Sequence, residues 1–221
     1  MALFGDKKDK NIAIKTDKIS SATIITSDMK VTGNLNGNDT IHVDGSIIGD
    51  IIVNNTLVIG KSGIVEGNVE AKHAIINGEL RGTIKCDNLE VMQTGKVSHR
   101  IEAKYLILDG NIDGEISATE EVEVLENANI SAVCLKSKTI AVHGKIEGTV
   151  IASEILEIGS KGFVEGQITV KNIKTEEGGR MIGTMSTYQE EDFKPKASKK
   201  GAKPSSKNSK KENEDDFFSE E

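Results

Sequence analysis

A long-range internal copy constrains the fold of this chain more than any other feature of its sequence. Leu57 to Lys72 reads LVIGKSGIVEGNVEAK, and Leu156 to Lys171, which lies 99 residues later, reads LEIGSKGFVEGQITVK. The two segments match at eight of sixteen positions without a gap. A copy of this kind within one chain indicates a repeat architecture, in which each repeat packs on its neighbours.

The period of the repeat follows from four short blocks of the form x-Gly-x-apolar-x-Gly-x-apolar. The blocks are DGSIIGDI, NGELRGTI, DGNIDGEI and HGKIEGTV, and their first glycines are Gly45, Gly78, Gly110 and Gly144. These glycines are 33, 32 and 34 residues apart. A second block, Leu-x-Ile-x-x-x-Gly-x-Val, lies between them, so each period divides into two turns of about 16 to 17 residues.

Apolar and polar residues alternate within the blocks, which is the pattern of strands with one buried face. Glycines interrupt the pattern too often for helices, and hairpins would place equivalent positions on opposite sides. Coiling the chain superimposes them instead. We therefore predict an all-β fold, a single-stranded parallel β-helix of about nine to ten turns. The variable turn length favours a right-handed coil over the left-handed hexapeptide form.

Composition agrees with this fold and limits the function. Aromatic residues make up 3% of the chain, and Ile, Val, Leu and 22 glycines supply the apolar and turn positions. We expect a flexible N-terminal segment at 1–18, the β-helix at 19–187 and a disordered charged tail at 188–221. A net charge of −7 argues against nucleic-acid binding. Without an apolar run of 18 residues or a secretory signal, we expect a cytoplasmic protein.

The N-terminal segment carries a candidate membrane-binding peptide. Leu3 and Phe4 directly precede Lys7 and Lys8. Apolar burial contributes about 1.5–3 kcal/mol per side chain and each lysine about 1 kcal/mol at an anionic leaflet. That sum becomes useful when an assembly displays many copies of the peptide. The alternative is a disordered terminus without a binding role.

The C-terminal tail separates its charges into two blocks. Lys194 to Lys211 holds eight lysines and no acid, and Glu212 to Glu221 holds six acids around Phe217 and Phe218. Such composition predicts disorder. The tail is either a solubilising extension or a segment that binds a membrane or a protein partner, with Phe217 and Phe218 as its docking residues.

Aligning the repeats tests the residues that could carry chemistry. Cys86 aligns with Val53, Ala118 and Ala152, and Cys134 aligns with inward aliphatic positions, so we expect both to be buried core residues.

The four histidines, His42, His73, His99 and His143, align with four different positions of the repeat, and we expect no converging metal site. No position suggests a catalytic group or a cofactor, so we expect no enzyme activity.

The ends of the repeat are the remaining candidates for function. A β-helix ends in strand edges that template further pairing unless a cap covers them, and the flanking sequence contains no amphipathic capping helix. Phe163 is the only Phe in the repeat region, where the first copy has Ile64. We assign a polymerisation contact near the C-terminal end of the repeat to four residues, Phe163, Ile173, Met181 and Ile182.

With these features the chain resembles the bactofilins, a family of polymer-forming bacterial cytoskeletal proteins. The resemblance rests on the MALFGDKK start, the DGxIxGxI and LxIGxxGxVxG blocks and the charged tail. It implies a right-handed, three-faced β-helix that polymerises end to end without nucleotide. It also implies attachment to an anionic membrane surface through the N-terminal peptide, a scaffolding role in cell shape, envelope or appendage organisation, and a contact role for Phe163.

Two other functions are compatible with a β-helix. One is an acyltransferase of the left-handed hexapeptide type, which would need a histidine in a cleft between subunits of a trimer. The other is a β-helical adaptor that contacts envelope or cytoskeletal proteins through its tail. The uniform repeat and the absence of caps favour the self-assembling scaffold over both.

Overall fold

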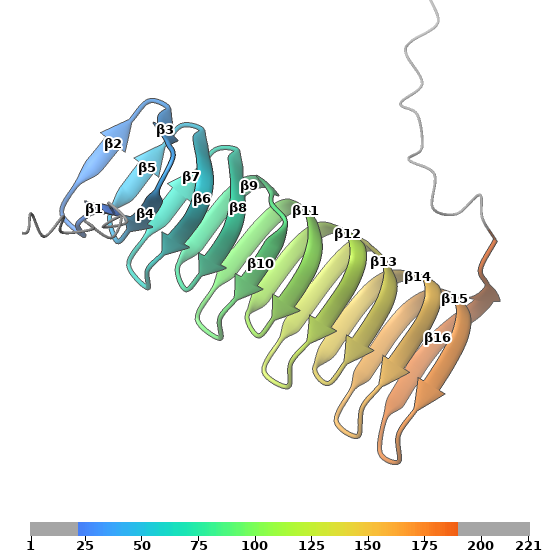
Figure 1. The fold of residues 1–221 in the computed structure, drawn as a ribbon. Coiled ribbons are helices and arrows are strands. Elements are labelled where there is room, and N and C mark those ends of the chain that lie inside the picture. The colour runs from blue at the N-terminus through green and yellow to red at the C-terminus, as the bar shows by residue number, and fades with distance from the viewer. Residues whose placement is uncertain (1–21, 190–221) are drawn as a thin grey trace, which may run out of the picture.

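The structure, a computed structural model, describes residues 22–189, which form one elongated rod of parallel strands (Figure 1). The first and last described residues lie at opposite ends of this rod. Its strands are β1 (Ala22–Ile25), β2 (Lys30–Thr32), β3 (Leu35–Gly37), β4 (Thr40–Val43), β5 (Ser46–Ile48), β6 (Ile51–Ile59), β7 (Ile64–Glu66), β8 (Val69–Ile76), β9 (Glu79–Lys85), β10 (Asn88–Val91), β11 (Lys96–Leu108), β12 (Asn111–Val124), β13 (Asn129–Val142), β14 (Lys145–Ile158), β15 (Phe163–Thr175) and β16 (Arg180–Thr187).

Every strand pairing in the described part of the chain is parallel, and each strand pairs with the strand one turn earlier or later. The first turns show three separate ladders, which begin at β1, β2 and β3. From β11 to β15 one strand of 13 or 14 residues runs through all three. The chain makes about ten turns, so the predicted parallel β-helix is confirmed, while its right-handed coil stays a prediction.

The core is a set of aliphatic columns that run along the rod axis. Register places equivalent residues of successive turns directly above one another, and the inward ones are buried. One such column contains Ile47, Val65, Leu80, Val97, Ile112, Ile130, Ile146 and Val164, all at most 3% exposed. Ile and Val fill these columns well because their branched side chains pack on a pleated surface.

The first corner of each turn explains the two-turn period. As far as β15 it alternates between two residues, as at Asp109–Gly110 and His143–Gly144, and four residues, as at Gly60–Gly63 and Gly159–Gly162. The last corner, between β15 and β16, again has four residues. In the longer form the last residue donates a backbone hydrogen bond to the first, at 2.9 Å in both of these corners. Successive turns therefore differ in length, and two of them make up the 33-residue repeat.

The second corner is a stack of residues with positive φ. Gly67, with φ 149°, pairs through its amide with Arg81, and a Cβ there would lie 2.3 Å from the carbonyl oxygen of Gly49. Glycine is required because neighbouring backbones approach this closely. His99, with φ 95°, is the one non-glycine residue with positive φ among residues 22–189.

The structure confirms one cysteine prediction and contradicts the other. Cys86 is 8% exposed and lies in the inward column of Ala103 and Ala118. Cys134 is only half-buried, because β13 contains an extra residue at this point and Leu135 takes the inward position opposite Ile116. The prediction of a buried Cys134 was therefore wrong.

Candidate polymerisation surface

At the C-terminal end of the rod, core positions come to the surface. In the described part of the chain β16 pairs only with β15, so no further turn covers it. Ile173, Met181 and Met185 continue three inward columns and are 37%, 38% and 46% exposed. The residues one turn earlier in the same columns are at most 1% exposed: Leu156, Val164 and Ile168.

The N-terminal end is uncovered in the same way among the described residues. Val31 and Leu35 are partly buried and pack against the core, whereas the next residues in their columns, Ile47 and Ile51, are 0% exposed. Thr23, which pairs with the buried Ile41, is exposed. This end also exposes Ile24 and Met29, at 64% and 51%.

Both ends combine apolar columns with strand edges, and this combination suits self-association. An open strand edge presents backbone donors and acceptors to another strand. The C-terminal side chains are about two-fifths exposed, so burying the rest of each contributes about 1 kcal/mol. Backbone pairing along β16 would add direction and register to an apolar contact at this end.

The walls of the rod differ from its ends because ion pairs link successive turns there. Arg81 contacts Glu66 at 2.8 Å, and Lys104 contacts Asp87 at 2.8 Å. The hydrogen bond from Lys104 holds the pKa of Asp87 below its ordinary value. Such exposed pairs contribute little stability but keep most of the wall polar, so the largest uncovered core area lies at the ends.

Among residues 22–189 no group of three or more His, Cys, Asp or Glu side chains could hold a metal ion. The same residues contain no apolar helix of membrane-spanning length. The four histidines lie in four different columns, as predicted: His42 pairs with Val58, His73 with Thr56 and His99 with Gly82, while the His143 amide bonds to Val124 at the first corner.

Comparison with known families identifies the family of the chain. The family model described as "Bactofilin: Polymer-forming cytoskeletal" matches residues 23–109 and 103–186. The chain belongs to the bactofilin family. It is therefore a polymer-forming cytoskeletal protein, not an enzyme.

Two curated bactofilins of Myxococcus xanthus (strain DK1622) are similar to parts of the chain. Bactofilin BacP is 32% identical over 62 residues, which are 28% of this chain and 26% of BacP. Bactofilin BacO is 30% identical over 72 residues, 33% of this chain and 57% of BacO. The chain thus spans about a quarter and just over half of these relatives. No solved structure was found to match it.

Two of the four residues assigned to the bactofilin contact lie together at the C-terminal end. Ile173 and Met181 both occupy inward columns of the last turn. Ile182 is on the same strand but faces outward above Glu165, and it is 56% exposed. Phe163 lies one turn earlier, in the outward column between Lys145 and Arg180.

Phe163 is half-buried at the rim of this end. The Lys145 ammonium nitrogen lies 5.9 Å from the centroid of its ring, which is within the range of a cation–π contact. Phe163 is not a strand partner of Ile64. Both residues occupy the same outward column, as the sequence copy predicts.

Sequence reasoning missed Met185 at this surface. It continues the inward column of Ile168 and is 46% exposed. The signal that could have found it is its distance of 17 residues from Ile168, one turn of the repeat. The other assigned residues, Leu3, Phe4, Lys7 and Lys8 for the membrane and Phe217 and Phe218 for a partner, lie outside the described residues.

Proposed function

We propose that this bactofilin stacks end to end into nucleotide-independent filaments that serve as a scaffold at the cytoplasmic face of a bacterial membrane. The observation that carries the proposal is the exposure of core columns in the last turn, at Ile173, Met181 and Met185. A second rod placed on this end would continue the columns and the strand ladders. Such a scaffold would organise cell shape, the envelope or an appendage.

A charge in an inward column of the last turn tests the end contact. In Met181→Glu the carboxylate would be buried in each junction, and loss of roughly 2–3 kcal/mol would raise the critical concentration for assembly by about 30- to 150-fold. Pelleting at high speed against protein concentration measures this value.

Val133→Glu is the matched control, because Val133 is 78% exposed on the wall of the rod, away from both ends. It should assemble at the concentration of the unmodified chain. Phe163→Arg tests the rim, and its effect should be smaller than that of Met181→Glu because Phe163 lies one turn below the end. Equal assembly of Met181→Glu and the unmodified chain would exclude the C-terminal end as a contact.

We assign membrane attachment to the N-terminal peptide with Leu3, Phe4, Lys7 and Lys8. One copy binds weakly, but a filament displays it many times, which raises the apparent affinity by roughly 10²–10⁴. Deletion of residues 2–8 should abolish co-sedimentation with anionic vesicles and leave filaments intact. Vesicle binding that survives this deletion would locate the membrane contact elsewhere.

Contacts with envelope or cytoskeletal proteins are assigned to the tail at 188–221, with Phe217 and Phe218 as docking residues. Capture of cell proteins by the full chain, compared with Phe217→Ser/Phe218→Ser, measures this role. Equal capture by both chains would assign partner binding to the rod.

A further inference from the structure

One wall of the rod differs from the others in its side chains. We call it the Tyr105 face; it consists of the two outward columns on the strands that lead into the first corner, one containing Tyr105 and the other Ile107. From the first turn to the ninth these columns contain no lysine or arginine. Their apolar members include Val58, Ile75, Tyr105, Ile107, Ala141 and Ile155.

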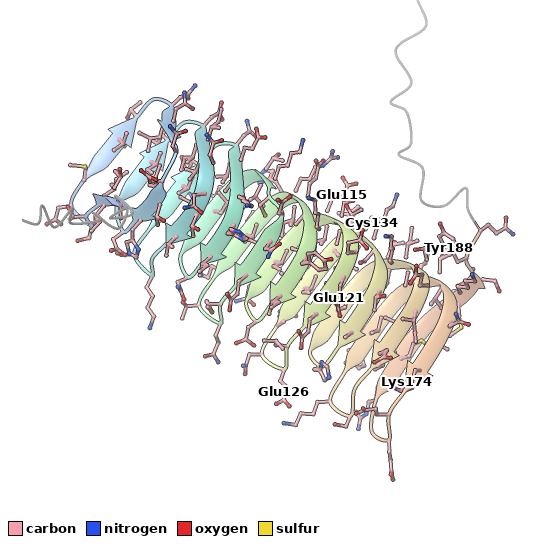
Figure 2. All side chains as sticks on the ribbon, viewed as in Figure 1. Glu115, Glu121, Glu126, Cys134, Lys174 and Tyr188 are labelled. Carbon is pink, nitrogen blue, oxygen red and sulfur yellow. The ribbon has the colours of Figure 1, made fainter. Side chains whose placement is uncertain are left out.

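Tyr105 and Ile107 are 49% and 40% exposed, and a shallow hollow of about 350 Å³ lies beside them. Three of the four acids of this face, Glu121, Glu123 and Glu157, lie in its C-terminal half, with Glu121 on the side turned to the viewer in Figure 2, and the fourth, Glu90, lies in the fifth turn. The histidines of the face lie in its N-terminal half, at His42 and His73. This unequal distribution of histidines and acids along one wall is the basis of the inference.

Two copies of the rod can place their Tyr105 faces together in antiparallel orientation. A two-fold axis parallel to the strands, between the fifth and sixth turns, keeps each column opposite itself and reverses the order of the turns. His73 of the fourth turn then faces Glu121 of the seventh, both in the Tyr105 column. By the same axis His42 of the second turn faces Glu157 of the ninth, both in the Ile107 column. Symmetry forms each pair twice.

The same axis also matches uncharged side chains. Thr56 faces Thr139, and Asn88 faces Tyr105, whose hydroxyl can accept from the amide. Val58 faces Ala141 in the Ile107 column. The matches cover turns two to nine, so they extend along most of the rod.

Two positions oppose this arrangement. Glu90 faces Ile107, and Glu123 faces Ile75, so the carboxylates lose water without gaining a partner. The pairing is therefore weak for one pair of rods. In filaments the contact repeats with every chain, and many weak contacts then act together.

The local charges identify His73–Glu121 as the decisive pair. His42 already bonds through Nε2 to Asp44 Oδ2 at 3.0 Å, and Glu157 already contacts Lys174 at 3.4 Å. His73 lies in the field of Asp87, whose partner is Lys104. No ion pair involves Glu121 in the part of the chain that the structure describes. An imidazole N–H from a second copy would supply its missing donor.

We propose that the Tyr105 face is a second self-association surface, through which filaments of this bactofilin pair side by side in antiparallel orientation. The occupant is a second copy of the same chain because histidines and carboxylates match under one axis in both columns. The inference rests on the filaments proposed above for its repeated contact, and it adds a lateral contact that the ends do not provide.

A charge swap across the proposed axis tests this contact with the full chain. His73→Glu places two carboxylates opposite each other at both symmetry-related sites, and the fraction of filaments that pellet at low speed should fall roughly tenfold because the loss repeats along the filament. Electron microscopy should show single filaments. His73→Glu/Glu121→Lys restores an opposite-charge pair and should restore paired filaments. Glu90→Gln removes an opposing carboxylate and should increase pairing.

Ser98→Glu is the matched control, since it adds the same charge on another wall, between Arg81 and Asp113. Paired filaments in His73→Glu, single filaments in the double variant, or loss of pairing in Ser98→Glu would each overturn the proposal. High-speed pelleting separates this result from failure of the filament proposal. If nothing pellets at high speed, end-to-end stacking fails; if single filaments pellet at high speed but never pair, only the lateral contact fails.

Discussion

His99 lies at a corner position that is glycine in the two neighbouring turns, and its backbone is strained. Its φ is 95°, and its neighbours in the corner stack, Gly82 and Gly114, have φ values of 151° and 146°. A side chain in this region costs about 1–2 kcal/mol, whereas a glycine costs about 0.5–1 kcal/mol through the unfolded chain. We expect His99→Gly to raise the free energy of unfolding by roughly 0.5–1 kcal/mol, measured by the denaturant midpoint.

Gly114→Ala is the control for this prediction, because its Cβ would lie within bonding distance of the His99 carbonyl oxygen. It should lower the midpoint strongly. A midpoint of His99→Gly at or below that of the unmodified chain would show that the positive φ at this position is not strained.

Cys86 makes stability depend on alkaline pH. Burial, and next the charge of Asp87, raises the pKa of this thiol from 9.0 to about 12. As the pH rises, the thiol ionises in the unfolded chain before it ionises in the folded chain. The stability that it contributes is therefore complete below about pH 9 and is lost as the pH rises toward 12. Cys86→Ala fits the column of Ala103 and Ala118 and removes this dependence. Between pH 8 and pH 10.5 we expect the unmodified chain to lose roughly 2 kcal/mol more than the variant.

The comparison uses chemical unfolding at both pH values. Lysines and tyrosines titrate in the same range, but they are common to both chains and cancel in the difference. An equal loss of stability in the two chains would mean that the Cys86 thiol ionises in the folded rod.

Among the elements, β13 is irregular because it replaces a corner glycine by a bulge. Ala132 pairs with Gly114 and Gly148, both of positive φ, yet Ala132 itself is not in that region. The extra residue Val133 follows it and is 78% exposed. The bulge therefore allows a residue with a Cβ to occupy the corner position. Deleting Val133 would force Ala132 into positive φ, and we expect a loss of about 1–2 kcal/mol.

Adding Ala132→Gly to the deletion should recover this stability, since the corner then matches its neighbours. Thermal unfolding of the two variants and the unmodified chain provides the measurement. If the deletion alone is as stable as the unmodified chain, the bulge does not relieve corner strain.

At this bulge the sequence could not predict which residues of the strand face inward. Repeat alignment placed Cys86 correctly, because its turn has no insertion. It misplaced Cys134 because Val133, Cys134 and Leu135 are all apolar, and any of them could fill the inward position. A one-residue shift exchanges the two sides of a strand, and only the three-dimensional register resolves it.

At the level of the whole molecule, the repeat period was enough to predict the fold. Predicting which residues share a surface also required the strand register. The repeat predicted the parallel β-helix and its turn count, since stacking is the arrangement that superimposes like positions. It placed Ile173 and Met181, but not Met185, among the exposed residues near the C-terminal end, because exposure at the end depends on which turn is last. The match of His73 with Glu121 depends on counting turns across β8 to β12, which bulges make unreliable in sequence.

A rod built from interchangeable turns should tolerate removal of one whole period. Deleting residues 111–144 joins Gly110 to Lys145, which occupies the same outward column as Asn111. The turn of β11 would then stack directly on the turn of β14, with Val97 next to Ile146 and Leu108 next to Ile158. The core columns would stay continuous.

Both ends of the shortened rod are unchanged, so filaments should still form through them. The axial repeat per chain should fall from roughly 48 Å to roughly 38 Å, since each turn contributes about 4.8 Å. Electron microscopy of the filaments measures this repeat. A deletion that ends at residue 140 instead breaks the register and should abolish assembly. Filaments with an unchanged repeat, or equal assembly of both deletions, would show that the turns are not the axial unit of the polymer.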